Sequence, residues 1–266
     1  MIHLPVGEDG RVDPEAVRTA LTPGTLAVAI MAANNEIGTV QPVAEIGGIC
    51  REAGVVYMAD IAQSLGKIPM PLGELGVELA AMSAHKLYGP KGVGALYVRS
   101  TPRTARIRPQ VHGASQERGL RAGTPNVPGI VGFGAACELA RQEMGEEASR
   151  CLELRDRLLA GLRAGVGDLA VNGSMEHRLP QNLHVSIPGV EARAVLEALP
   201  DIGMSAGSAC TAEETRLSHV LVALGLPEDR ALSSLRFGVG RHTTIEDVDD
   251  AVDRIVTTVA RLQAGR

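Results

Sequence analysis

A lysine follows an apolar run in the segment SAHKLYGPKG, residues 83–92. If residues 78–85 form a buried strand, Lys86 lies at the carboxyl edge of a sheet, where open α/β sheets bind their ligands. A partly desolvated lysine there can attack a carbonyl carbon and form a Schiff base. Ser83 and His85 beside it carry donors suited to a phosphate group. The alternative for Lys86 is an ordinary solvated loop lysine.

Two further apolar runs end in polar residues. Asp60 closes the run VVYMAD, Gln63 follows three residues later, and Asn35 follows the run TLAVAIMAA. An aspartate at such an edge can hold a pyridinium nitrogen protonated, which makes pyridoxal phosphate an electron sink. A glutamine amide can donate to the phenolic oxygen of that cofactor. The alternative for Asp60 is a helix N-cap, but three such strand ends on one edge favour a site for pyridoxal phosphate.

Two residues in the second half of the chain could act on a substrate. Cys210 lies in SAGSACTAEE, where small residues surround it and acidic residues follow it. That composition indicates an exposed loop, in which reactivity explains a thiol better than packing does, although an incidental cysteine is the alternative. Arg236 lies inside an otherwise apolar strand-like run. Such an arginine needs a carboxylate partner, either an acidic residue of the protein or the α-carboxylate of an amino-acid substrate.

The elements that must position these residues alternate between strand-like and helix-like runs as far as about residue 124. Apolar compact runs predict strands, and PVAEIGGICREA predicts a helix with Pro42 in its first turn. The expected strands are 25–33, 55–60, 78–85 and 93–100. This spacing is typical of βαβ units, in which helices cover a parallel or mixed sheet.

A different pattern follows after about residue 124. A helical stretch covers 127–162, as one helix or as two helices broken near Gly145. Apolar residues spaced three to four apart from Ile245 onwards predict a closing helix, with Thr243 and Glu246 as its capping box. The other expected elements are strands 169–173, 182–189, 202–209 and 232–240 and a helix 191–199. The sequence therefore predicts an α/β domain over 1–136 and a smaller α+β domain over 137–266.

The composition excludes several classes of protein. The chain has 266 residues, a net charge of −5 and only 2% aromatic residues. It offers neither the basic face nor the stacking aromatics that nucleic-acid binding uses. No apolar run approaches the roughly 20 residues of a membrane helix, and no secretory signal is present, so a cytoplasmic protein is expected. Four cysteines without a CxxC pair give no zinc or thioredoxin motif, and no metal site is expected.

Six segments in order resemble one family: NNEIG, DIAQ, SAHKLYGPKG, ERGLRAGT, GSACT and SSLRFGVGR. Together they resemble the cysteine desulfurases, pyridoxal-phosphate enzymes of the aminotransferase class V group. The resemblance implies an aspartate-aminotransferase-like (fold type I) large domain, present here in part. Its sheet would be mixed but mostly parallel, and a smaller α+β domain would carry the cysteine loop.

The resemblance also implies a role for each cofactor residue. Lys86 would hold pyridoxal 5′-phosphate covalently and later transfer a proton. Asp60 would pair with the pyridine nitrogen. Gln63 and Asn35 would contact the phenolic oxygen and the polar edge beside it, and Asn35 would also contact the substrate.

The phosphate and the substrate would be bound by further residues. By the same resemblance, Ser83 and His85 would hold the phosphate, joined by Thr124 from the second subunit of a homodimer. Arg236 would bind the carboxylate of L-cysteine. Cys210 would attack the sulfur, release L-alanine and keep a persulfide for an acceptor protein, such as an iron–sulfur scaffold or a thiolation protein.

Members of this family begin well upstream of residue 1. The upstream part supplies a phosphate loop at a helix N-terminus and a histidine that stacks on the pyridine ring. We therefore expect residues 1–124 to be the second half of a cofactor domain, in a fragment, a mis-started frame, a chain that another chain completes, or a degenerate paralogue. The alternative functions are a selenocysteine lyase, another class V lyase or aminotransferase, and a non-catalytic binding protein.

Overall fold

The computed structural model describes residues 1–206 and 217–265. Cys210 therefore lies outside the described residues. The chain divides into two compact units. We call them the parallel-sheet unit, made of 14–32 and 42–144, and the antiparallel-sheet unit, made of 1–13, 33–41 and 145–266. The predicted domain boundary at residue 136 lies inside a helix, and the two units do not follow a single cut through the chain.

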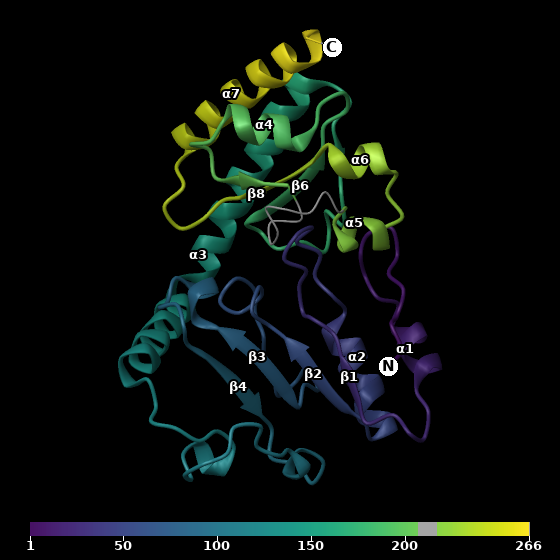
Figure 1. The fold of residues 1–266 in the computed structure, drawn as a ribbon, viewed down its shortest axis with the longest axis vertical. Coiled ribbons are helices and arrows are strands. Elements are labelled where there is room, and N and C mark those ends of the chain that lie inside the picture. Colours follow the sequence, from purple (N-terminus) through teal and green to yellow (C-terminus); the bar gives the residue numbers. More distant parts are fainter. Residues whose placement is uncertain (207–216, 266) are drawn as a thin grey trace. The chain divides into compact units, whose positions relative to one another are not determined.

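The parallel-sheet unit is built on four strands in the order β1-β2-β3-β4 (Figure 1). β1 to β3 run parallel, and β4 runs antiparallel to β3. The strands are β1 (Ala27–Ala29), β2 (Val56–Asp60), β3 (Leu79–Ser83) and β4 (Gly94–Val98). Each falls inside an expected strand but is shorter, so the mixed, mostly parallel sheet predicted from the sequence is confirmed.

Helices and short 3₁₀ turns complete this unit. α2 contacts β2 and buries its apolar side, and it ends at Gly54, whose φ of 68° is a left-handed cap. The elements are α1 (Pro14–Ala20), α2 (Val43–Ala53), η1 (Ala84–Leu87), η2 (Thr104–Arg106), η3 (Glu117–Gly119) and the first part of α3 (Val127–Val166). α1 was not predicted, whereas α2 lies where the sequence placed a helix.

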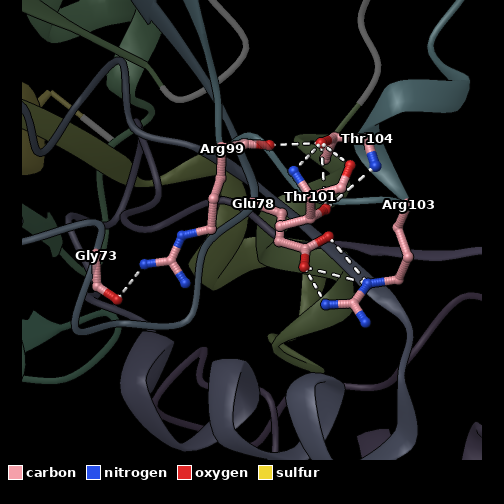
Figure 2. Close-up of polar contacts among 6 residues, drawn as sticks. All are labelled: Gly73, Glu78, Arg99, Thr101, Arg103 and Thr104. Carbon is pink, nitrogen blue, oxygen red and sulfur yellow. Dashed lines mark hydrogen bonds and ion pairs between the residues drawn. The ribbon is translucent and has the colours of Figure 1, made fainter.

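A polar cluster ties the amino end of β3 to the segment after β4 (Figure 2). Glu78, whose side chain is 6% exposed, accepts two hydrogen bonds from Arg103 Nε at 3.1 and 3.3 Å and a further one from Nη2. Thr101 and Thr104 each accept from the backbone N–H of the other, at 3.3 and 3.0 Å. The cluster therefore fixes the amino end of β3, whereas Ser83 is the residue at the carboxyl end of the same strand.

The antiparallel-sheet unit has four strands in the order β5-β6-β8-β7, all antiparallel. The strands are β5 (Ala170–Val171), β6 (Asn182–Ser186), β7 (Met204–Ser205) and β8 (Ser234–Gly238). The helices are the later part of α3, α4 (Ala192–Ala198), α5 (His219–Ala223), α6 (Glu228–Leu232) and α7 (Ile245–Ala264). α5 and α6 were not predicted.

The two faces of this sheet differ in polarity. Leu183, Val185, Leu235 and Phe237 point to one face and join a core with residues of α3, α4 and α7. Because side chains alternate along a strand, the opposite face carries the intervening residues. They are polar: Asn182, His184 and Ser186 on β6, Ser234 and Arg236 on β8, and Ser205 on β7. Four of the six are buried, so this is a polar face that is shielded from water.

Two details of the helices correct the sequence predictions. α3 runs from Val127 to Val166 without interruption, so the alternative of a break near Gly145 was wrong. The capping box of α7 uses Thr244 and Asp247, not Thr243 and Glu246. Thr243 Oγ1 instead accepts the backbone N–H of Gly240 at 3.0 Å, so its hydroxyl is engaged elsewhere. In the part of the chain that the structure describes, no helix is long and apolar enough to cross a membrane.

Candidate active site

The carboxyl ends of β2 and β3 meet at one edge of the parallel sheet. The strands are parallel, with Asp60 opposite Ala81, and the N–H of Ile61 continues the pairing by donating to Ala81 O at 2.9 Å. Asp60 is the exposed last residue of β2, and its Oδ1 accepts the N–H of Ala62 at 2.8 Å. Asp60 therefore caps the following turn and still presents a carboxylate at the edge.

Lys86 lies on the 3₁₀ turn η1 directly after β3. A 3₁₀ helix repeats every three residues, so Ala84 and Leu87 both face the interior and are buried. His85 and Lys86 between them are exposed. The turn closes where the N–H of Gly89 donates to Ala84 O at 3.0 Å. The spacing of small and apolar residues thus presents the imidazole and the amine together at the sheet edge.

Five of the predicted cofactor residues come from these two strand ends. Ser83 is the last residue of β3, and Gln63 lies in the turn after Asp60, each half-buried. With Asp60, His85 and Lys86 they occupy one edge of the sheet. Thr124 belongs to the same unit but lies exposed in the loop before α3, and no hydrogen bond among the described residues joins it to the other five.

Asn35 and Arg236 belong to the antiparallel-sheet unit, where the structure joins them directly. Arg236 Nη1 donates to Asn35 O at 3.0 Å. Asn35 is exposed on a turn that Asn34 holds, because Asn34 Oδ1 accepts the N–H groups of the residues at 36 and 37, at 2.9 and 3.0 Å. Gly38 is needed in this turn, since its φ is 71° and a Cβ there would lie 2.3 Å from Asn182 Oδ1.

Arg236 has no carboxylate within ion-pair distance among the described residues. The buried acid of the turn, Glu36, instead accepts a 2.6 Å hydrogen bond from Ser218 Oγ. Burial raises the pKa of Glu36, while Ser218, His219 and Arg236 oppose that rise. The guanidinium of Arg236 is thus left to bind an anion from outside the described protein. Sequence reasoning missed Glu36 and Ser218, although an acid within NNEIG was a signal for the former.

The polar side chains at the parallel-sheet edge match the groups of pyridoxal phosphate. The Lys86 amine suits the aldehyde, the Asp60 carboxylate the ring nitrogen, and the Gln63 amide the phenolic oxygen. Ser83 and His85 offer donors for the phosphate. In the described ranges, no group of three or more histidine, cysteine or acidic side chains is arranged to hold a metal ion.

Comparisons with known proteins agree on one family. The aminotransferase class-V family matches residues 1–251. The cysteine desulfurase IscS of Anaeromyxobacter sp. (strain Fw109-5) is 54% identical over 260 residues, which cover 98% of this chain and 64% of that protein. The mitochondrial cysteine desulfurase of Arabidopsis thaliana is 51% identical over 98% of this chain and 57% of its own length. The chain thus spans less than two thirds of these curated relatives.

A solved structure of a NifS-like protein has a similar fold. It superposes with a TM-score of 0.88 at 37% identity, covering 98% of this chain and 68% of that protein.

Proposed function

Because the chain belongs to the aminotransferase class-V family, we propose that it serves as a pyridoxal-phosphate-dependent cysteine desulfurase. The reaction takes sulfur from L-cysteine, releases L-alanine and leaves a persulfide on Cys210. The observation that carries the proposal is the exposed amine of Lys86 on the turn after β3, at the edge where β2 presents Asp60. The similarity to the two cysteine desulfurases supports the choice of substrate.

Each side chain has a defined task in this proposal. When bound, pyridoxal phosphate supplies an electron sink that weakens bonds at the α and β carbons of the substrate. Lys86 anchors the cofactor and moves a proton at the substrate α carbon, while Asp60 keeps the ring nitrogen protonated. Arg236 binds the substrate carboxylate, and Asn35, which accepts from Arg236, holds that guanidinium in place.

The sulfur step balances without an external oxidant. The Cys210 thiolate attacks the sulfur of L-cysteine, the Cβ–S bond breaks and an S–S bond forms. The β carbon takes up a proton and alanine leaves, so the sum is one thiol and cysteine giving one persulfide and alanine. The sulfur then passes to an acceptor protein, such as an iron–sulfur scaffold or a thiolation protein. A homodimer in which Thr124 reaches the partner's phosphate site, and a cytoplasmic location, belong to the same proposal.

Cofactor binding is the first test. The protein purified with pyridoxal phosphate is expected to show the visible absorption band of cofactor held on a lysine. Lys86→Ala should abolish the band. Lys91→Ala, in the exposed turn five residues further on, should keep it and serves as the matched control. A wild-type protein without the band would contradict the enzyme proposal and favour a non-catalytic binding protein.

Turnover is the second test. L-cysteine should yield alanine and, with a reductant, sulfide. Cys210→Ser should keep the absorption band and lose the persulfide, because the cofactor residues are intact and the acceptor thiol is gone. Persulfide transfer that persists in Cys210→Ser would remove Cys210 from the mechanism. A higher kcat/KM for selenocysteine than for cysteine would instead indicate a selenocysteine lyase.

A further inference from the structure

Three polar residues form a row across the polar face of the antiparallel sheet. The strand register places His184 of β6 opposite Arg236 of β8, and Ser205 of β7 opposite Arg236 on its other side. Residues directly opposite in an antiparallel pair project from the same face, with Cβ atoms about 5 Å apart. Arg236 therefore has a histidine on one side and a serine on the other.

Hydrogen bonds around His184 identify which ring nitrogen carries the proton. Arg230 Nε and Nη2 donate to Asn172 Oδ1 at 3.1 and 2.7 Å. Because an arginine can only donate, these bonds fix the orientation of the Asn172 amide, and the amide atom on the other side is the nitrogen Nδ2. That nitrogen lies 3.1 Å from His184 Nδ1, which must therefore be the acceptor. A neutral ring with an unprotonated Nδ1 carries its proton on Nε2. His184 Nε2–H is thus a hydrogen-bond donor.

Both neighbours of Arg236 have a donor that nothing in the described protein accepts. His184 is fully buried, and its Nε2 has no hydrogen-bond partner among the described residues. The same holds for the buried Oγ of Ser205 within the described part of the chain. Buried polar atoms are almost always paired, and an unpaired one is destabilising. Two such donors, beside an arginine that has no carboxylate partner among the described residues, form a site that suits an acceptor carrying negative charge.

We propose that His184 and Ser205 are specificity-determining residues that complete the site for the substrate α-carboxylate around Arg236. The inference rests on the proposed function for the identity of the substrate. A carboxylate has two oxygens with about four acceptor positions, enough for the Arg236 fork and for both donors, directly or through one ordered water. Arg236, His184 and Ser205 together thereby bind the carboxylate of an amino acid, and an amine without a carboxylate binds more weakly.

The test compares two ligands that differ by the carboxylate alone. Protein supplied with pyridoxal phosphate is titrated calorimetrically with L-alanine and with ethylamine. In Ser205→Ala and in His184→Phe, L-alanine should bind about tenfold more weakly or worse, while ethylamine binding should stay within about twofold. His184→Gln, which keeps an N–H near the Nε2 position, should restore alanine binding to within about threefold of wild type.

Two features keep the variants interpretable. Asn172 Nδ2 also contacts Ser186 Oγ at 2.8 Å and Ser234 Oγ at 3.1 Å, so its two hydrogens keep acceptors when His184 Nδ1 is removed. Tyr57→Phe is the matched control, since it deletes another buried hydroxyl without a partner among the described residues, at the amino end of β2. It should leave the affinity for both ligands unchanged.

Each outcome decides the inference separately from the proposed function. Equal weakening of alanine and ethylamine would show a structural role only and overturn it, as would unchanged alanine binding in both variants or no alanine binding to the wild type. Turnover of L-cysteine is measured alongside. Selective loss of alanine binding in a protein without turnover would keep the carboxylate site and reject the desulfurase proposal.

Discussion

His184 is the most strongly perturbed titratable residue of the antiparallel sheet. Burial lowers the pKa of the imidazole to about 3, and the charges of Arg178 and Arg236 act in the same direction. The ring is consequently neutral at physiological pH, so it adds no positive charge beside Arg236. A protonated ring at this position would repel the guanidinium that is proposed to bind the substrate.

The free energy of unfolding should therefore depend on pH through His184. Its pKa is lower in the folded protein than the ordinary 6.5, so between pH 6.5 and about 3 the unfolded chain binds the extra proton. The contribution of neutral His184 to the free energy of unfolding is fully present above pH 6.5. It decreases as the pH falls, by up to about 1.4 kcal/mol per pH unit. Urea unfolding of wild type and His184→Gln at pH 7, 6 and 5 measures this slope. We expect a flatter profile in His184→Gln, and parallel profiles would contradict the assignment.

Residues at the ends of strands could be picked out from the sequence. Residues whose role follows from lying on the shielded face of a sheet could not. Lys86 and Asp60 could be predicted because each directly follows an apolar run. His184 and Ser205 could not, because their segments indicate strands but not which face is shielded. That is decided by distant contacts, such as the hydrogen bond from Asn182 Nδ2 to Glu36 O at 2.9 Å, across 146 positions.

At the scale of elements, the Glu78–Arg103 pair should stabilise the attachment of β3 to the segment after β4. Figure 2 shows the contacts between the two side chains, of which Glu78 is buried and Arg103 is partly exposed. Glu78→Gln should lower the free energy of unfolding by about 1–3 kcal/mol, because it removes charge-assisted hydrogen bonds from a buried acceptor. Thermal or urea unfolding measures this. Glu138→Gln, in the exposed pair with Arg141, is the control and should change nothing measurable. Equal effects of the two variants would refute the argument.

The start of α7 supports a second prediction at this scale. Thr244 accepts from Asp247 N at 3.1 Å, and Asp247 Oδ2 accepts from Thr244 N at 2.9 Å. Thr244→Ala should cost about 1 kcal/mol of stability because it leaves a helix N–H without its cap. Thr244→Ser keeps the hydroxyl and should cost much less in the same unfolding measurement. A serine variant as unstable as the alanine variant would argue against the capping role.

The elements themselves were largely predictable, and their ends were not. All eight strands of the described chain fall within the expected runs, but β1 keeps only three residues of the run 25–33. The capping box was predicted one residue early because Thr243–Glu246 and Thr244–Asp247 both fit the motif. The hydrogen bond to Thr243 from Gly240, which decides between them, is a contact that the motif does not encode.

For the molecule as a whole, the fold class predicted from the sequence is confirmed by the likeness to the NifS-like structure. Which segments of the chain make up each of the two units was harder to predict from the sequence. The antiparallel-sheet unit takes in residues 1–13 and 33–41, which precede its main part by more than a hundred positions. No pattern within 137–266 indicates that its polar face needs segments from the start of the chain.

This arrangement predicts that residues 145–266 do not form the native antiparallel sheet on their own. The fragment would lack Gly38 O, which accepts from Leu179 N at 2.9 Å, and Asp9 O, which accepts from Ser174 N at 3.0 Å. It would also expose the polar face, including the side chain of Asn182. Hydrogen exchange should show the Ile187 amide, which donates to Ser233 O at 3.0 Å across the ends of β6 and β8, protected in the whole chain and unprotected in the fragment.

The parallel-sheet unit supplies the matched control. Fragment 14–144 contains every segment of that unit, so the amide of Ile61, which donates to Ala81 O, should stay protected in it. The two fragments have similar lengths, and they differ in whether the segments that close their sheets are present. Native protection of Ile187 in 145–266 would show instead that residues 1–13 and 33–41 only cover a sheet that folds without them, and the polar face would then be stable in contact with water.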